Sequence, residues 1–283
     1  MFRLLALHAH PDDESSKGAA TVASYVDAGV HAVLVTATGG EAGDILNPAM
    51  DRPEIAADLV AVRRAELEEA AAIIGYHQVI MLGYRDSGMP GTEDNARADA
   101  FTNAEHDEVL ERLVTIVRAE KPHVILGYDS HERYPHPDHL AVHRYGLDLF
   151  TAAADADLFP DAGEPWAVAK LYAPVFSVTR IVKIHQAMLE RGEESPYAEW
   201  IERVDADADV GKRLTAVDIS ATIGRGRDAL RAHRTQVDPD GFWFRVPQDV
   251  VLASYPYEDF ELMAARVPIE PRESGLFDGI SVD

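Results

Sequence analysis

Short apolar runs alternate with longer stretches of helical periodicity along the first half of the chain. Short apolar runs predict strands that are covered on both faces, whereas apolar positions recurring every three to four residues predict amphipathic helices. The alternation predicts an α/β fold with a doubly wound, mostly parallel, Rossmann-like sheet. The predicted strands are residues 2–8, 31–38, 78–82 and 123–128, and the predicted helices are residues 16–27, 53–74 and 105–121.

The pattern loosens in the second half of the chain. It predicts further strands at 169–175 and 215–219 and helices at 179–190 and 221–233. A serine- or glycine-rich linker does not separate the two halves, so the sequence favours one domain over two. We expect a single hydrolase domain over residues 1–283, in which an α/β core of residues 1–165 carries a C-terminal elaboration, 166–283, that walls the active-site cleft.

The composition narrows the class of partner. The chain has 26 basic and 49 acidic residues, a net charge of −23, which opposes binding to nucleic acid or to an anionic membrane surface. No run approaches the roughly 18 apolar residues of a membrane span, and the apolar run at residues 1–7 is too short for a signal sequence. We therefore expect a cytoplasmic protein with a small-molecule substrate and no obligate protein partner.

Polar and titratable residues gather in the segments that follow the four predicted strands, at 10–14, 39–44, 83–88 and 129–139. In open α/β sheets, ligands bind in the crevice beyond the carboxyl ends of the strands, so these segments should meet. Because the chain has no cysteine, any zinc here must be bound by histidine and carboxylate.

The first candidate motif is the turn after the first strand. His10 and Asp13 can supply two of the three protein ligands of a catalytic zinc site, which keeps one position open for water. Asp12, beside them, can then take a proton from the water that the metal activates. The alternative is an acidic helix N-terminus, where carboxylates stabilise the helix dipole without any metal.

The second candidate motif spans residues 134–139, far along the chain. Its prolines, Pro135 and Pro137, predict an exposed turn at a helix start. His139 is our third metal ligand. His136 is expected to stabilise the oxyanion or protonate the leaving amine, with the Asp138 carboxylate holding its imidazole.

Two further features of this segment remain open. Tyr134 can donate a hydrogen bond to the oxyanion, although it can equally be an ordinary loop aromatic. A rival ligand set uses His143 together with His139, because residues four apart share a helix face. His143 lies a turn deeper in the helix, away from the crevice, which favours the first set.

The two motifs, residues 9–14 and 136–139, resemble the signature motifs of the LmbE-like de-N-acetylases. Further matching stretches lie at 14–21, 38–48 and 236–244, so the resemblance runs across nearly the whole chain. It implies one zinc ion per subunit bound by His10, Asp13 and His139, with Asp12 as general base and His136 as charge-stabilising partner. Ferrous iron is an alternative metal, since two histidines and a carboxylate also bind iron.

Within that family, the chain is most similar to the amidases that cleave mycothiol S-conjugates. The resemblance implies hydrolysis of a thiol–sugar conjugate to a mercapturic acid and glucosaminyl-inositol, in thiol-based detoxification. The runner-up activity is N-deacetylation of N-acetylglucosaminyl-inositol or a related sugar. Lys17 favours the amidase, because the related deacetylases are expected to carry a small polar residue at that position, and a cation near the metal can engage the acyl group.

The same resemblance implies three further substrate-binding residues. Arg63 and Asp86 are expected to bind the sugar and inositol hydroxyls, and Gln236 the amide or acyl end. The alternative for Arg63 is a solvated helix residue paired with Glu66. The glycine-rich segment 39–47 is either a lid over the site or a simple turn.

Overall fold

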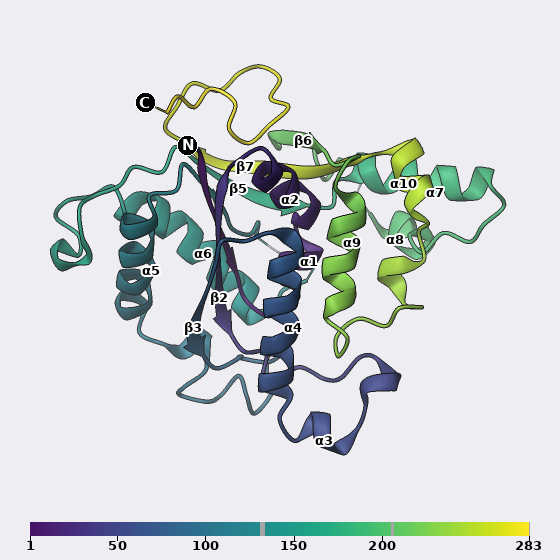
Figure 1. Ribbon diagram of the computed structural model, residues 1–283, viewed down its shortest axis with the longest axis horizontal. Coiled ribbons are helices and arrows are strands. Elements are labelled where there is room, and N and C mark those ends of the chain that lie inside the picture. The colour runs from purple at the N-terminus through teal and green to yellow at the C-terminus, as the bar shows by residue number, and fades with distance from the viewer. Residues whose placement is uncertain (131–133, 205–206, 283) are drawn as a thin grey trace.

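The computed structural model describes residues 1–130, 134–204 and 207–282. Within these ranges, seven strands form a single sheet, with helices on both of its faces (Figure 1). In chain order the strands are β1 (Arg3–His8), β2 (His31–Thr38), β3 (Gln78–Tyr84), β4 (Val124–Leu126), β5 (Lys170–Val175), β6 (Leu214–Asp218) and β7 (Tyr257–Ala265).

Among the described residues, helices α1 to α6 lie within residues 1–165 and α7 to α10 within residues 166–283. The α-helices are α1 (Asp13–Ser16), α2 (Ala19–Asp27), α3 (Pro53–Ala56), α4 (Leu59–Ile74), α5 (His106–Glu120), α6 (Pro137–Ala152), α7 (Val178–Glu190), α8 (Ala198–Arg203), α9 (Ile223–Ala232) and α10 (Gln248–Ser254). Short 3₁₀ helices lie at η1 (Pro48–Met50), η2 (Phe101–Asn103), η3 (Pro160–Ala162) and η4 (Phe242–Phe244).

The strand order is β3-β2-β1-β4-β5-β7-β6. The first five strands of this order are parallel, and β7 runs antiparallel to both β5 and β6. The predicted doubly wound, mostly parallel sheet is confirmed. The order reverses between β1 and β4, and the crevice beyond the carboxyl ends at such a reversal is where α/β folds bind ligands.

Strand β1 shows why both faces of the sheet are covered. Leu4 and Ala6 belong to the core that includes residues of α2, α4 and α9, whereas Leu5 and Leu7 belong to the core that includes residues of α5 and α6. Successive side chains of a strand point to opposite faces, so a wholly apolar strand requires a helical layer on each side. The strand is therefore central, and its C-terminal end is held rigidly.

Two predicted helices are each divided in the structure. The helix expected at 16–27 breaks at Lys17 and Gly18, where Gly18 has φ +94°. Glycine suits this position because of its positive φ and because a Cβ there would meet the Phe260 ring at 3.2 Å. The helix expected at 53–74 divides into α3 and α4. The first break matters for the site, since it leaves Lys17 in a turn rather than on a regular helix face.

Strand β7 is absent from the sequence predictions although it lies inside the sheet. Its carboxylates, Glu258, Asp259 and Glu261, interrupt the apolar pattern. Asp259 is only 2% exposed, and its carboxylate accepts hydrogen bonds from Ser177 Oγ at 2.5 Å and Tyr255 Oη at 2.8 Å. Local hydrogen bonds thus allow a polar residue in a buried strand.

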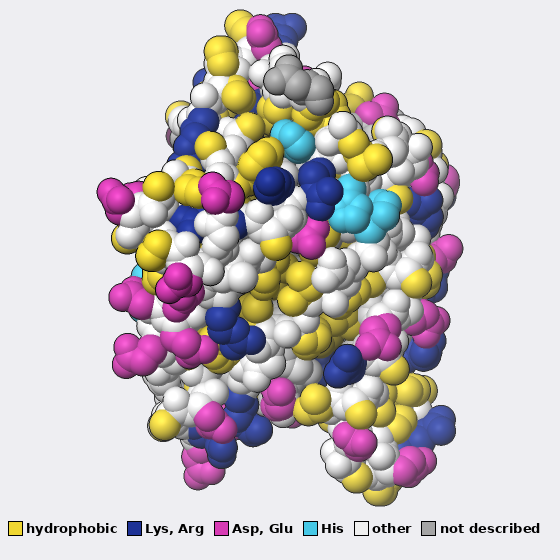
Figure 2. Space-filling model, turned by 60° about the vertical axis from the view of Figure 1, so that its left-hand side comes forward, with side chains coloured by type: hydrophobic (Ala, Val, Ile, Leu, Met, Phe, Trp, Pro, Cys, Tyr) yellow, Lys and Arg dark blue, Asp and Glu magenta, His cyan; other side chains and the backbone are white. Residues whose placement is uncertain are grey.

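The surface agrees with a small-molecule rather than a polyanionic partner. On the face drawn in Figure 2, acidic and basic side chains are interspersed, and the chain as a whole carries a net charge of −23. Among the residues that the structure describes, the helices are too short or too polar to cross a membrane.

Candidate active site

The turn between β1 and α1 places His10, Asp12 and Asp13 beyond the carboxyl end of β1. Asp12 caps α1 with φ +115°, a conformation that costs residues with a Cβ about 1–3 kcal/mol. Surrounding contacts hold it there. The Asp12 backbone N–H donates to Glu14 Oε2 at 3.0 Å, and Arg63 Nη2 donates to the Pro11 carbonyl oxygen at 2.7 Å.

Three buried side chains converge beside this turn. His139 comes from the first turn of α6, and its Nε2 lies 3.4 Å from Asp13 Oδ2. His10 Nδ1 lies 3.5 Å from the same oxygen. The ligand atoms of these three residues all lie within 4.8 Å of one another, so the structure brings the expected ligand set together.

The charges of this set suit a divalent cation. Burial opposes the charge on Asp13, but Lys17 and His139 outweigh it and hold its pKa well below the usual range. Burial lowers the pKa of His139 to about 3. At neutral pH Asp13 is therefore an ionised carboxylate and His139 a neutral imidazole, the protonation states that bind zinc. Burial opposes the charge on His10, but Asp13, Asp138 and Asp86 outweigh it and raise the pKa of His10, so a metal must displace a proton from that ring.

A second layer of contacts fixes His10. Its Nε2 lies 3.1 Å from Asp138 Oδ2, and the same oxygen accepts the backbone N–H of Ser87 at 3.0 Å. A carboxylate on the far nitrogen of a metal-binding histidine fixes its ring orientation and raises its basicity. Asp138 thus orients the His10 ring so that its Nδ1 lies toward Asp13 Oδ2, at 3.5 Å.

This contact corrects the expected pairing of Asp138 with His136. His136 is the N-cap of α6, and its Nδ1 accepts the backbone N–H of Asp138 at 3.2 Å. The Asp138 carboxylate binds His10 and Ser87 instead. Because Nδ1 accepts a hydrogen bond, the proton of a neutral His136 ring lies on Nε2.

The expected exposure of this turn is confirmed for Tyr134 and Pro135 and wrong for the residues that follow. His136, Asp138 and His139 are 7%, 0% and 3% exposed, whereas Tyr134 is 54% exposed. The prolines do start the helix, with Pro137 in its first turn. The segment nevertheless follows β4, which lies between β1 and β5, so the loops after the neighbouring strands cover it.

His136 and Tyr134 border the ligand set. The His136 ring lies 4.6 Å from the His10 ring, centroid to centroid, and its Nε2 is 3.9 Å from Asp86 Oδ1. Burial, followed by the nearby His10, lowers the pKa of His136. Tyr134 stacks on His136 at 6.1 Å, so its ring lies at the mouth of the site.

Lys17 lies directly against the ligand set. Its Nζ is 2.5 Å from Asp13 Oδ1 and 3.3 Å from Ser16 Oγ. Burial opposes its charge, but Asp13 outweighs this and raises the pKa of Lys17. A cation therefore stands within reach of any group bound at these ligands.

Arg63 is buried, contrary to the alternative of a solvated helix residue. It is 3% exposed, and its Nη1 donates to the Gly40 carbonyl oxygen at 2.9 Å. A Cβ at Gly40 or Gly43 would collide with this guanidinium. Glu66 contacts Thr235 rather than Arg63, accepting its Oγ1–H at 2.6 Å.

The other two expected substrate residues bond to the chain itself. The Asp86 carboxylate accepts the backbone N–H groups of Gly88 at 2.8 Å and Ala42 at 3.3 Å. Gln236 Nε2 donates to the Asp44 carbonyl oxygen at 3.0 Å. Together with the Arg63 contact, these bonds tie segment 39–47 to its surroundings. Asp86 Oδ1 also lies 3.5 Å from His10 Nε2, so its carboxylate reaches the site.

The rival ligand His143 is engaged elsewhere. Its Nδ1 donates to the Tyr128 carbonyl oxygen at 2.9 Å. Neither candidate ligand group found among the described residues includes it. One group is His10, Asp13 and His139; the other is His10, Asp86, His136 and Asp138.

One buried contact had no sequence signal. Glu14 Oε1 lies 2.6 Å from His233 Nε2, and both side chains are fully buried. The same carboxylate accepts the Asp12 backbone N–H. The two residues are 219 positions apart, so only the tertiary fold could show that the end of α9 supports the turn.

The chain matches the PIG-L family, GlcNAc-PI de-N-acetylase, over residues 5–150. It is 41% identical to a mycothiol S-conjugate amidase of Streptomyces coelicolor, over 98% of this chain and 97% of that relative. The chain belongs to this family. Within the LmbE-like de-N-acetylases, it is also 37% identical to a 1D-myo-inositol 2-acetamido-2-deoxy-alpha-D-glucopyranoside deacetylase of Geodermatophilus obscurus, over 98% of each chain.

Solved structures agree on the fold. N,N'-diacetylchitobiose deacetylase from Pyrococcus horikoshii superposes with a TM-score of 0.61 at 19% identity, over 92% of this chain and 83% of that chain. The protein TT1542 from Thermus thermophilus has a TM-score of 0.60 at 22% identity, over 97% of this chain and 100% of that one. The chain is therefore an enzyme of the deacetylase and amidase class, which hydrolyses amide C–N bonds.

Proposed function

We propose that the chain is a zinc-dependent amidase that cleaves S-conjugates of mycothiol to a mercapturic acid and glucosaminyl-inositol. The observation that carries this proposal is the buried set of His10, Asp13 and His139 with Lys17 directly against it. The 41% identity to a mycothiol S-conjugate amidase supports the choice of substrate. Such a reaction removes alkylated thiols, so we assign the enzyme to thiol-based detoxification in the cytoplasm.

Zinc bound by His10, Asp13 and His139 would polarise the amide carbonyl and lower the pKa of water toward about 7. Asp12 is our general base. Its side chain is 29% exposed, with Oδ2 at 3.4 Å from Arg63 Nη2. Burial raises the pKa of Asp12 against the attraction of Arg63, which makes its carboxylate a stronger base for the attacking water.

We propose that His136 stabilises the negative charge that develops on the carbonyl oxygen during hydrolysis. Its proton on Nε2 faces the site, because Nδ1 is occupied by the Asp138 backbone. Nε2–H can donate a hydrogen bond to the oxyanion of the tetrahedral intermediate. The proton that Asp12 takes from the attacking water can then pass to the leaving amine of glucosamine. Tyr134, which stacks on His136, is proposed to donate a second hydrogen bond to the oxyanion through its hydroxyl. The C–N bond then breaks, leaving a carboxylate on the acyl product and an amine on the sugar.

We assign the substrate's two ends to opposite sides of the ligand set. Lys17 is proposed to engage the acyl end. Asp86, whose Oδ1 lies 3.9 Å from His136 Nε2, is proposed to bind sugar hydroxyls. Arg63 is proposed to support the sugar side and Gln236 the amide or acyl end, and each also bonds to the backbone of segment 39–47.

The second candidate function is N-deacetylation of N-acetylglucosaminyl-inositol. It would use the same ligands and the same base, and several deacetylase relatives are 34–37% identical over nearly the whole chain. The two reactions differ in the acyl group alone. Only the acyl side of the site, including Lys17, therefore distinguishes them.

Product identification tests the proposal. Zinc-loaded protein incubated with an S-alkylated mycothiol should release the mercapturic acid and glucosaminyl-inositol in equal amounts by mass spectrometry. The same protein dialysed against a chelator should release neither product until zinc is restored. Release of acetate from N-acetylglucosaminyl-inositol, without cleavage of the conjugate, would establish the second candidate.

A further inference from the structure

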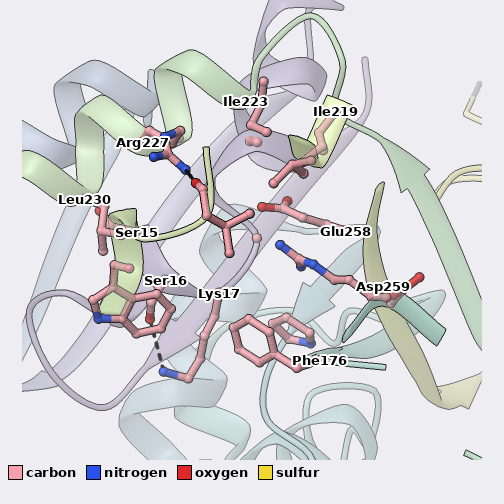
Figure 3. Close-up of a pocket in the computed structure, with 18 of the residues that line it drawn as sticks. Ser15, Ser16, Lys17, Phe176, Ile219, Ile223, Arg227, Leu230, Glu258 and Asp259 are labelled. Atoms are coloured by element: carbon pink, nitrogen blue, oxygen red, sulfur yellow. Dashed lines mark hydrogen bonds between the residues drawn. The ribbon is translucent and has the colours of Figure 1, made fainter. Parts of the chain in front are cut away.

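A cavity of about 120 Å³ lies beside the ligand set, between the α1–α2 turn and the C-terminal half of the chain. Figure 3 shows Lys17 and Ser16 on one side and Phe176, Ile219, Ile223 and Leu230 around it. The side chains come from β5, α7, α9, η4, α10 and β7 as well as from the turn. Both halves of the chain therefore build it.

Lys17 is shared by the cavity and the proposed active site. This residue lines the cavity, and its Nζ lies 2.5 Å from Asp13 Oδ1. The cavity therefore begins one side chain away from the Asp13 carboxylate.

The back of the cavity is apolar. Ile184, Ile219 and Ile223 line it and belong to a buried core cluster. A wall of this kind gains free energy by covering an apolar group and loses it by covering an unpaired polar one.

Three aromatic side chains form what we call the aromatic lip of the cavity: Phe176, Phe242 and Trp243. They are 39%, 49% and 37% exposed, although aromatic rings of this size gain most from burial. The Trp243 ring lies 6.3 Å from Phe176 and 5.6 Å from Phe242. A contiguous exposed aromatic cluster beside a cavity is typical of a ligand-binding surface.

The acidic groups of the cavity are already occupied by the chain. Glu258 accepts the backbone N–H of Thr21 at 2.9 Å, and Asp259 accepts from Ser177 and Tyr255. Among the cations, Arg227 donates to the Val246 carbonyl oxygen at 3.2 Å. The Nε of Arg180 is buried and has no hydrogen-bond partner among the described residues. The Arg180 guanidinium lies over the Phe176 ring, 5.3 Å from its centroid.

We propose that this cavity binds the S-substituent of the substrate's cysteine, against the aromatic lip and the apolar back wall. This inference rests on the proposed amidase function and specifies its substrates as thioethers with neutral, apolar S-substituents. The size agrees: an engineered apolar cavity of about 150 Å³ binds benzene. A single aromatic ring is therefore the expected substituent.

Binding of product analogues tests the cavity without relying on turnover. The probes are S-benzyl-N-acetylcysteine and S-methyl-N-acetylcysteine, titrated calorimetrically into the zinc-loaded full chain. The benzyl compound should bind at least about tenfold more tightly, because only its ring covers the aromatic lip. Trp243→Ala should reduce this ratio to about threefold or less.

The controls keep the outcome decisive. Phe176→Ala is the second lip variant should Trp243→Ala fail to fold, and both positions are partly exposed. Leu158→Ala, at a residue 42% exposed and outside the cavity lining, should leave the ratio unchanged. Equal binding of the two probes, or a preference that both lip variants retain, overturns the proposal. Failure of the proposed function would instead appear as no cleavage of any mycothiol conjugate by wild type.

Discussion

Asp12 combines an unfavourable backbone with a proposed chemical role. Its φ of +115° is held by the hydrogen bond to Glu14 and by Arg63 against the Pro11 carbonyl. Strain of this kind persists only where neighbours over-determine it, and it clusters at functional sites. The contacts that hold Asp12 place its carboxylate next to the Asp13 ligand.

Replacing the base without disturbing the turn gives the first prediction. Asp12→Asn should lower kcat by about 10²–10⁴-fold, the span usual for a general base. Asparagine tolerates positive φ, so the turn and the zinc content, measured by elemental analysis, should be retained. Turnover near wild type would remove Asp12 from the mechanism.

The choice of third ligand is testable with a matched pair of variants on α6. His139→Ala should lose zinc on dialysis because its Nε2 lies against Asp13. His143→Ala should keep zinc, since His143 bonds to the Tyr128 backbone. Full metal occupancy in the first variant and loss in the second would favour the rival ligand set.

The corrected role of Asp138 gives a further prediction at this scale. Asp138→Asn removes the charge behind His10 Nε2 and should weaken zinc binding by about 10–100-fold.

The matched control is His136→Gln. It should lower kcat while leaving the zinc dissociation constant within about twofold, because His136 is not one of the proposed ligands. Competition with a chromogenic chelator measures both constants. Equal zinc affinity in wild type and Asp138→Asn would contradict the positioning role.

At the scale of elements, the parallel half of the sheet was predictable because its strands are apolar on both faces. The prediction for β2 matches its observed bounds, and the segments after the strands meet where the topology requires. Strand β7 was not predictable, since Asp259 is tolerated only through Ser177 and Tyr255. A pattern along the chain cannot show partners that belong to other elements.

The buried pair between α1 and the end of α9 is the main element-scale contact at the site. Burial opposes the charge on His233, but Glu14 outweighs it and raises the pKa of His233. Burial likewise opposes the charge on Glu14, and His233 outweighs it and lowers the pKa of Glu14. The histidine contribution is full below its ordinary pKa of 6.5 and declines as pH rises through the raised value. The glutamate contribution is full above 4.5 and declines as pH falls through the lowered value.

Both contributions are full between pH 4.5 and pH 6.5. In this range His233→Asn should therefore lower the free energy of unfolding by about 3–5 kcal/mol, the usual effect of leaving a buried charge unpaired. The deficit should shrink at alkaline pH. Urea denaturation at pH 6 and pH 9.5 measures it. Arg234→Ala is the control, since its pair with Glu69 is about half exposed and should contribute less than about 1 kcal/mol. A deficit of that small size for His233→Asn would show that the pair is not stabilising.

At the scale of the whole molecule, the site is built by two distant parts of the chain. The residues that form recognisable motifs, such as His10, Asp13 and His139, were predictable because the sheet brings strand ends together. The contact of His233 with Glu14 and the place of Trp243 in the aromatic lip were not predictable from the sequence, because both depend on how the C-terminal half packs. Under the proposed function, the C-terminal half and Lys17 together set the specificity for the acyl group.

The most direct test compares two substrates of the zinc-loaded protein, because a ratio of kcat/KM values reports differential stabilisation of transition states. The substrates are an S-alkylated mycothiol and N-acetylglucosaminyl-inositol, which share the sugar and differ in the acyl group. We predict a kcat/KM at least about tenfold higher for the conjugate, as expected if Lys17 and the cavity stabilise its acyl group. A higher kcat/KM for the acetylated sugar would contradict the amidase assignment and identify a deacetylase.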